Sequence, residues 1–341
     1  MTPICGGLCR SVGARLALGI LLTALSMGTV RAQQNPNPPS APDYSKAEVH
    51  ILPVQGNIYM LVGAGGNITV QTGNDGVLLV DTGVAQMSDK VLAAVRSISD
   101  KPIRYIINTH VHPDHTGGNE AIAKAGSTIA GGNVVGDIGA SAGNQAAVIA
   151  FQAVLDRMSA PTGQQAPTPE HAWPTETYTT AERKLFFDGE GIEIIHVPAA
   201  HTDGDSMVFF RRSDVISAGD IFVTNRYPII DLQRGGNVQG VIAGLNKIIE
   251  LAIPRDEQEG GTMVIPGHGR LCDVADVVFY QEMVTIIRDR VEDMIKKGMT
   301  LEQVKAAKPT RDYDPRYGAT SGIWTTDMFL EAVYKSLGAK P

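Results

Sequence analysis

Residues 109–118 read Thr-His-Val-His-Pro-Asp-His-Thr-Gly-Gly and follow a short apolar run, residues 105–107, that predicts a β-strand. Side chains two positions apart on extended backbone point to the same side, so His110 and His112 can reach one metal ion. Pro113 then turns the chain and offers Asp114 and His115 to a second ion close by. Imidazole and carboxylate groups bind divalent metals, and four of them within six residues predict a metal site.

Three further residues of the same chemistry stand in similar places along the chain. His201 follows a predicted strand at residues 192–197, Asp220 follows one at residues 215–217, and His268 follows one at residues 262–265. Loops that follow strands gather at one edge of a pair of sheets and commonly carry functional side chains. A site shared with residues 110–115 is the simplest explanation.

The rest of the chain alternates between short apolar runs and helical periodicity. Strands are predicted at residues 49–54, 58–62, 67–71, 77–80, 105–107, 184–187, 192–197, 207–210, 215–217 and 262–265. Helices are predicted at residues 88–98, 118–125, 145–158, 238–251, 274–297 and 301–307, and residues 160–180 predict a surface loop or lid. Each half of the chain has strands first and a helix after them. This order indicates an α/β (α+β) protein in which two sheets pack face to face with helices outside.

The first 46 residues precede the predicted fold. Arg10 and Arg15, an apolar run at residues 16–27 and a small-residue ending at Ala32 predict a secretory signal peptide over residues 1–32. The apolar run is shorter than the roughly 18 residues that a bilayer span needs, so we expect no stable membrane span after cleavage and a periplasmic or secreted location. Residues 33–46 predict a flexible linker, residues 47–272 the main domain, and residues 273–341 a helical extension packed on the same domain.

The charge of the chain bears on its partners, and the cysteine content bears on its disulfides. Without residues 1–32 the chain keeps 26 basic against 36 acidic residues, a formal charge of −10. An enzyme of nucleic acids usually shows a basic face, so we expect no nucleic-acid partner and instead a small-molecule substrate. Only Cys272 remains, so no internal disulfide is possible. The oligomeric state stays open.

These residues together resemble the metallo-β-lactamase superfamily. The resemblance covers residues 49–272 and rests on Leu-Val-Asp-Thr-Gly at residues 79–83, on the His-x-His-x-Asp-His run, and on the three later residues, in that order. It implies a four-layer αββα sandwich of two mixed β-sheets flanked by helices, with two metal ions per chain. Zinc is the usual metal, and the ligand set also allows manganese or iron.

The resemblance also implies a role for each residue of the site. By position, the first ion would be held by His110, His112 and His201, the second by Asp114, His115 and His268, with Asp220 bridging both. Zinc lowers the pKa of bound water to about 7, so water can act as nucleophile without a serine or cysteine. Asp114 would be the catalytic residue that holds this water and helps to move its proton.

Two residues near the motifs have supporting roles in this interpretation. Asp81 is expected to orient a histidine ligand or the ligand loop, and its alternative is a turn-forming aspartate. Cys272 lies four residues after His268, and we expect a buried structural thiol because the metal ligands are already complete.

The substrate is less constrained than the chemistry. β-Lactamases with a cysteine ligand have cysteine where this chain has Asp220, and lysine where it has Val223, which argues against a dedicated penicillinase of that kind. An aspartate there is similar to glyoxalase II and lactonases. The predicted signal peptide, the two-metal site and a loop at residues 160–180 that could cover substrate nevertheless suit a periplasmic β-lactamase-like enzyme, so we expect a zinc-dependent hydrolase that attacks a β-lactam-like amide or an ester. The alternatives are a lactonase, a thioester hydrolase, or a non-catalytic metal-binding or relay protein.

Weaker candidates for substrate contact lie near these motifs. Tyr227, Arg226 and Arg234 follow Asp220, and Trp173 lies in the predicted loop at residues 160–180. An arginine can meet a substrate carboxylate. The alternative for the tyrosine is a packing role, and the alternative for the arginines is a solvated position on the surface.

Overall fold

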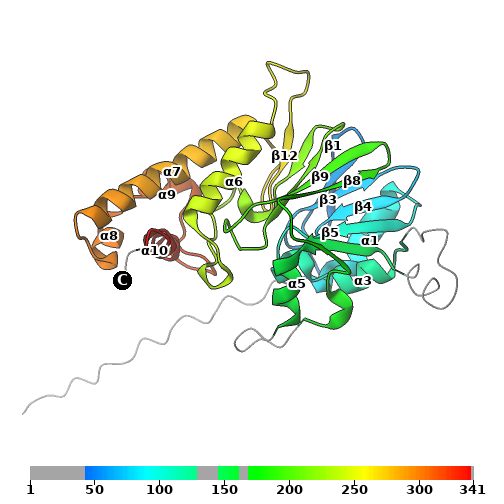
Figure 1. Ribbon diagram of the computed structural model, residues 1–341, viewed down its shortest axis with the longest axis horizontal. Coiled ribbons are helices and arrows are strands. Elements are labelled where there is room, and N and C mark those ends of the chain that lie inside the picture. The colour runs from blue at the N-terminus through cyan, green and yellow to red at the C-terminus, as the bar shows by residue number, and fades with distance from the viewer. Residues whose placement is uncertain (1–42, 129–144, 161–167, 339–341) are drawn as a thin grey trace, which may run out of the picture. The chain divides into compact units, whose positions relative to one another are not determined.

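The computed structural model describes residues 43–128, 145–160 and 168–338, and these contain two β-sheets that pack face to face (Figure 1). The first sheet has the strand order β1 (His50–Gln55), β2 (Ile58–Val62), β3 (Ile68–Thr72), β4 (Val77–Val80), β5 (Ile103–Ile107), β6 (Ala147–Phe151) and β7 (Glu176–Tyr178). Neighbouring strands from β1 to β4 are antiparallel, whereas β4 to β7 are parallel. The sheet is therefore mixed.

The second sheet has the order β13 (Cys272–Asp273), β12 (Met263–Ile265), β11 (Val215–Ser217), β10 (Ser206–Phe210), β9 (Glu190–His196) and β8 (Glu182–Phe187). Its neighbours are antiparallel except β11 and β12, which run parallel. Because parallel strands end at the same edge, the loops after β11 and β12 start side by side. Those loops carry two of the predicted metal ligands.

The space between the two sheets is filled by aliphatic and aromatic side chains. Met60, Leu78 and Ile107 of the first sheet pack in one cluster with Ile194 and Phe210 of the second, and all are buried. Removing such surface from water is the main driving force for the packing of two sheets. Strand β4, Val-Leu-Leu-Val, is buried at every position because both of its faces are covered.

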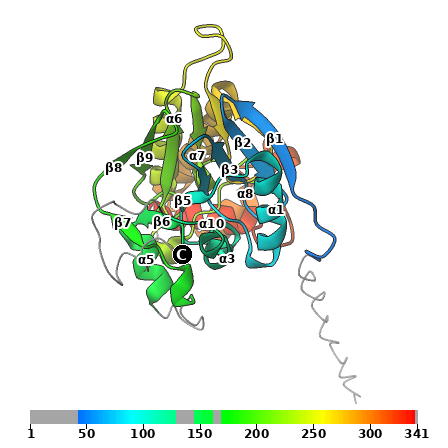
Figure 2. The ribbon, with the colours of Figure 1, turned by 90° about the vertical axis from the view of Figure 1, so that its right-hand side faces the viewer.

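Helices cover the outer face of each sheet. On the first sheet, Val91 and Val95 of α1 (Ser88–Ile98) and Ile122 of α3 (Asn119–Lys124) pack on strand residues. On the second sheet lie α6 (Val238–Leu251) and α7 (Val274–Lys296); α10 (Thr326–Ser336) packs on these two helices, and α8 (Leu301–Ala307) packs on α10. Figures 1 and 2 show α6 and α7 on one side of the sheets and α1 and α3 on the other. The predicted four-layer αββα sandwich is confirmed.

The remaining helical elements are short and lie in connections. They are α2 (Pro113–Thr116), α5 (Gln152–Ser159), α9 (Asp314–Tyr317), and the 3-10 turns η1 (Ala85–Met87), η2 (Glu170–Ala172), η3 (Gly219–Ile221) and η4 (Leu232–Arg234). The described residues belong to one compact unit, in which α10 contacts α6, α7 and α8.

Two predicted segments need correction. The helix predicted at residues 145–158 is strand β6 followed by helix α5, because Ala147–Phe151 pairs in parallel with β5 and β7 and four of its five residues are buried. A short apolar run of this kind fits a buried strand as well as a helix, and only the neighbouring strands decide. The predicted loop at residues 160–180 contains η2 and the edge strand β7 in its second half. Residues 161–167 lie outside the described part.

The predicted signal peptide, residues 1–32, and most of the predicted linker, residues 33–46, also lie outside the described residues. Among the described helices, none combines the length and the hydrophobicity required for a membrane crossing.

Candidate metal centre

Four loops bring the predicted ligands together at one end of the sandwich. These loops follow β5, β9, β11 and β12, so each begins at the carboxyl end of a strand. Within them, seven histidine and aspartate side chains form three overlapping groups whose ligand atoms lie within 4.8 Å of one another, and the residues are His110, His112, Asp114, His115, His201, Asp220 and His268. The sequence predicted all seven residues, and the structure places them in one cluster.

The first group contains His110, His112 and His201. The Nδ1 atom of His112 lies 2.8 Å from the Nε2 atom of His201, and the ring centroids of His110 and His201 are 4.6 Å apart. The outward nitrogen of His201, Nδ1, lies 2.7 Å from the carbonyl oxygen of Ile229, which fixes Nε2 as the inward atom. Three imidazoles thus converge on one point.

The second group contains Asp114, His115 and His268. The Nε2 atom of His268 lies 3.2 Å from Oδ2 of Asp114 and 3.4 Å from Nε2 of His115. Pro113 occupies the first helical position of α2, so the turn directly after His112 presents Asp114 and His115 toward this group.

Asp220 stands between these two groups and forms the third group with His110 and His115. One carboxylate oxygen, Oδ1, lies 3.3 Å from Nε2 of His115 and 3.5 Å from Nε2 of His268. The other, Oδ2, lies 3.8 Å from Nε2 of His201. A single carboxylate therefore faces both groups, which is the arrangement that a bridging ligand requires.

The residues present fit a pair of divalent metal ions. Nε2 of His110 and Oδ1 of Asp220 are buried and have no hydrogen-bond partner, a costly state unless a cation satisfies them. Burial, with the charge of His115 as the next cause, holds the pKa of His110 well below its usual range, and burial also lowers the pKa of His201. Neutral imidazoles are the form that binds metal.

His115 is held by two carboxylates. Burial would lower the pKa of His115, but Asp220 and Asp81 outweigh this effect and raise that pKa well above its usual range. A metal ion bound at this imidazole would therefore displace a proton. Asp81 orients the ring: its Oδ2 lies 2.7 Å from Nδ1 of His115 and also accepts from the hydroxyl of Thr109 at 2.7 Å, while Oδ1 accepts from the Thr109 N–H at 2.8 Å. Asp81 thus contacts both a ligand and the ligand loop.

Sequence reasoning missed a second carboxylate of this kind, Asp231. Its Oδ2 lies 2.9 Å from Nε2 of His112, the ring nitrogen that points away from the other histidines, and also accepts from Arg234 at 2.7 Å. Burial would raise the pKa of Asp231, but the hydrogen bonds from His112 and Arg234 prevail and hold that pKa well below its usual range. Asp231 is 119 residues from His112, and no local pattern connects them.

Two glycines allow the loops to approach the ligands this closely. A Cβ atom on Gly66 would lie 2.4 Å from Cε1 of His115, and one on Gly267 would lie 2.0 Å from Oδ1 of Asp220. Any side chain at either position would push a ligand aside. The Asn67 side chain also donates to the carbonyls of Pro266 and Gly269, which ties the first sheet to the loop of His268.

Asp114 is the most exposed of the seven. Its side chain is 38% exposed, against 0% for His115 and 12% for His268. Burial would raise the pKa of Asp114, but the hydrogen bond from His268 and the charge of His115 hold it well below its usual range. The carboxylate is therefore ionised at neutral pH and in reach of solvent.

The weaker candidates for substrate contact differ in their burial and in their hydrogen-bond partners. Tyr227 is 1% exposed, stacks on Phe329 and donates its hydroxyl hydrogen bond to the C-terminal residues Thr310 and Asp314, so the expected substrate contact is not supported and packing explains this residue. Trp173 is half-buried and donates to the carbonyl of Thr168.

The two arginines also differ. Arg226 is half-buried and its guanidinium donates to neighbouring Asn225. Arg234 lies beside the site through its ion pair with Asp231.

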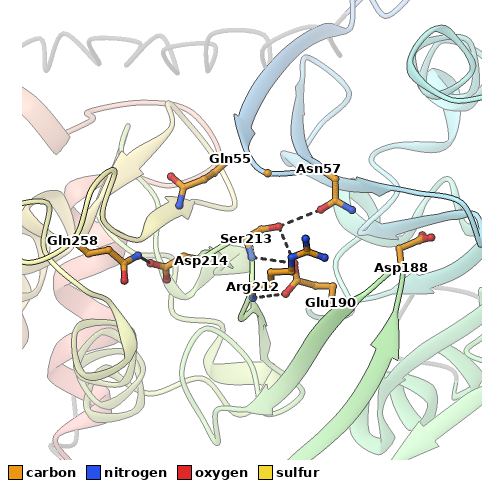
Figure 3. A pocket seen from close by; sticks show the side chains of 9 residues that line it. Gln55, Asn57, Asp188, Glu190, Arg212, Ser213, Asp214 and Gln258 are labelled. Atoms are coloured by element: carbon orange, nitrogen blue, oxygen red, sulfur yellow. Dashed lines mark hydrogen bonds between the residues drawn. The ribbon is translucent and has the colours of Figure 1, made fainter.

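A polar cavity of about 410 Å³ lies away from the metal centre, among the turns at the other end of the strands (Figure 3). Glu190 is 1% exposed there and accepts hydrogen bonds from the backbone N–H groups of Arg212 and Ser213 and from the Ser213 hydroxyl. None of the seven predicted ligands lines this cavity. The Glu190 carboxylate stabilises the turn between β10 and β11.

Comparison with known proteins identifies the protein family of this chain. The model of the metallo-β-lactamase superfamily matches residues 61–268, more than half of the chain. The linear primary-alkylsulfatase of Pseudomonas sp. (strain ATCC 19151) is 24% identical over 271 residues, which are 71% of this chain and 50% of that protein. The chain thus spans about half the length of this curated relative.

Solved structures show the same fold at lower identity. The stereoselective inverting sec-alkylsulfatase Pisa1 from Pseudomonas sp. has a TM-score of 0.61 at 17% identity, covering 84% of this chain and 50% of that one. The DIM-1 metallo-β-lactamase has a TM-score of 0.51 at 17% identity, covering 70% of this chain and 97% of that one.

Members of this family, including alkylsulfatases and β-lactamases, are hydrolases. With the αββα sandwich, the seven clustered histidine and aspartate side chains and a family model that matches most of the domain, the chain belongs to the metallo-β-lactamase superfamily.

Proposed function

We propose that this chain is a zinc-dependent hydrolase that uses two metal ions and water to attack the carbonyl of a β-lactam-like amide or an ester. The observation that carries the proposal is the pair of ligand groups with one carboxylate, Asp220, facing both. Imidazole and carboxylate are ligands that zinc accepts, although manganese and iron accept them too.

Zinc ions held there would lower the pKa of bound water to about 7 and stabilise negative charge that develops on the attacked group. The protein supplies the geometry. Asp81 and Asp231 each hold one imidazole from its far side, and such partners keep a ligand in one orientation and raise its basicity.

Asp114 is the residue we assign to proton movement. It is partly exposed and lies beside the second ligand group, 3.2 Å from Nε2 of His268, so it can hold the attacking water and help to move its proton to the leaving group. His110, His115 and His201 are fully enclosed and cannot exchange protons with substrate as readily.

A sulfate ester is the second candidate substrate, and the alkylsulfatase relative is the observation that favours it. Lactones and thioesters also stay open, because Asp220 stands where cysteine-ligand β-lactamases have cysteine. We further propose export, from the predicted signal peptide at residues 1–32. N-terminal sequencing of the protein from the source cell tests this: a start at Gln33 supports it, and a start at Met1 contradicts it.

The test of the function combines metal analysis with a substrate panel. Metal content of the purified protein is measured, and hydrolysis of a chromogenic cephalosporin, an acyl-homoserine lactone, a glutathione thioester, a p-nitrophenyl ester and an alkyl sulfate is followed with and without chelator. Asp114→Asn removes one negative charge with little change in shape. Asp203→Asn is the matched control, because Asp203 pairs with Arg157 and contacts none of the seven ligands in the described residues.

We expect two zinc ions per chain, chelator-sensitive turnover, and a loss of turnover of at least 100-fold in Asp114→Asn but not in Asp203→Asn. Preference for the sulfate ester would move the assignment to the second candidate. Metal binding with no turnover on any substrate would contradict the proposal and favour a metal-binding or relay protein.

A further inference from the structure

The hydroxyl of Thr109 lies between a carboxylate and a metal-ligand histidine. Its Oγ1 atom is 2.7 Å from Oδ2 of Asp81 and 3.0 Å from Nδ1 of His110. A hydroxyl carries one hydrogen and can therefore donate only one hydrogen bond. Asp81 acts as an acceptor here, because Oδ1 accepts from the Thr109 N–H and Oδ2 also faces Nδ1 of His115. The hydroxyl hydrogen of Thr109 therefore goes to Asp81.

This assignment decides which nitrogen of His110 carries the proton. Since the Thr109 hydroxyl has given its hydrogen to Asp81, it can only accept from His110, and Nδ1 must then be protonated. In a neutral imidazole the other nitrogen, Nε2, then keeps its lone pair. Nε2 of His110 is also the atom that is buried with no hydrogen-bond partner among the described residues. The hydroxyl thus leaves free the nitrogen that a metal ion would use.

The surroundings keep water away from this chain of hydrogen bonds. Asp81 is 2% exposed, and Thr109 and His110 are each 1% exposed. Gly219, which precedes the ligand Asp220, packs on the hydroxyl: a Cβ atom at Gly219 would lie 2.8 Å from Oγ1 of Thr109. Because these groups are enclosed, removal of one partner leaves another buried polar group unsatisfied.

We propose that Thr109 is a positioning residue that sets the tautomer of His110. Asp81 then serves both ligand groups, the first through this hydroxyl and the second through its direct contact with His115. The inference rests on the proposed function, because it takes the two groups to hold metal ions. Loss of the Thr109 hydroxyl should weaken binding of one ion, whereas loss of the Asp81 carboxylate should weaken binding of both.

The tautomer can be measured without metal and without turnover. In the metal-free protein with isotope-labelled histidine nitrogens, proton–nitrogen correlation spectra show which ring nitrogen of each histidine is protonated. We expect Nδ1 of His110 to be protonated in the native chain. In Thr109→Val this N–H has no acceptor, so most of His110 should change to the form protonated at Nε2. Thr109→Ser keeps the hydroxyl and should restore the native spectrum. A native His110 protonated at Nε2 would overturn the proposal, and this result requires no variant to fold.

Metal affinity provides the second test. Competition with a chromophoric zinc chelator gives one dissociation constant for each ion. Thr109→Val should weaken one ion about 10- to 100-fold, the usual effect when a metal-binding histidine loses its partner, and should change the other by less than about threefold. Thr109→Ser should recover most of this loss. Asp81→Asn should weaken both ions, because a single amide oxygen cannot accept the three hydrogen bonds that the carboxylate receives.

The matched control is Thr69→Val, which also removes a buried hydroxyl. Thr69 is 0% exposed and donates to Ser217, and in the described structure neither hydroxyl forms a hydrogen bond with any of the seven ligands. Equal weakening of metal binding in Thr69→Val and Thr109→Val would overturn the proposal. Zinc binding and an His110 tautomer that are both unchanged in Thr109→Val would also overturn it, while the proposed function would stand. A tautomer that changes as expected in a protein with neither zinc nor turnover would contradict only the proposed function.

Discussion

Replacement of Asp231 by asparagine should weaken metal binding at the first ligand group. The carboxylate lies 2.9 Å from Nε2 of His112, and the side chains are only 14% and 19% exposed, so water cannot readily replace the contact. A hydrogen bond to a charged group contributes about 1.5–3 kcal/mol, and loss of such a partner weakens metal affinity about 10- to 100-fold. The shielding places Asp231→Asn in the upper half of this range, about 30- to 100-fold.

The assay is a competition with a chromophoric zinc chelator, which gives the two dissociation constants separately. One constant should rise by the stated factor and the other should change less than threefold, because Asp231 contacts no residue of the second group in the described structure. Asparagine can still accept the backbone hydrogen bonds from Gln233 and Arg234 that cap η4, so the thermal midpoint of the metal-free protein should fall by only a few degrees.

The control is Asp203→Asn, which also removes a carboxylate paired with an arginine. It should leave both constants unchanged. Equal weakening in the two variants, or no weakening in Asp231→Asn, would refute the assignment of Asp231 as the residue that positions His112.

Three further predictions concern residues away from the ligands. Glu190→Ala should lower the free energy of unfolding by about 2–4 kcal/mol, measured by urea titration, because the Ser213 hydroxyl and two backbone N–H groups lose their acceptor. Metal binding should not change in this variant. A loss of metal would contradict the conclusion that the cavity around Glu190 is separate from the metal centre. Tyr227→Phe should cost about 1 kcal/mol through the lost bond to Asp314 and leave KM unchanged, whereas a severalfold rise in KM would restore a substrate contact. Burial raises the pKa of the Cys272 thiol to about 12, so peptide mapping should find it unmodified by iodoacetamide at pH 8 until urea unfolds the chain, and rapid labelling of the folded protein would contradict this.

The wrong helix prediction at residues 145–158 has a simple physical cause. The run Ala147–Phe151 is apolar at every position, and such a run fits either a buried strand or one turn and a half of helix. It becomes a strand because β5 and β7 offer backbone partners on both sides. In strand β8 the exposed and the less exposed residues alternate, so the period of a strand is present in the sequence itself. The predicted start of this strand, residue 184, is within two residues of the observed start, Glu182.

The predicted ligands and the missed residues differ in the same way. His110, His112, Asp114 and His115 are neighbours in the sequence, so spacing alone brings them to one place. Asp231 meets His112 only through the fold, and the burial of Tyr227 depends on Phe329 in the C-terminal extension. Contacts between distant segments have no local signal, unless each residue is a metal-ligand type that follows a predicted strand, as His201, Asp220 and His268 are.

The sequence by itself determined the order of strands and helices in most of the chain, the two-sheet arrangement and the seven histidine and aspartate residues of the candidate site. Local chemistry is sufficient for these, because period, turn residues and ligand type are properties of short segments. The tertiary structure decided which atoms face one another and which carboxylates hold His112 and His115. These features arise from the packing of segments more than 30 residues apart, whose relative positions are set by the burial of both sheets rather than by any motif.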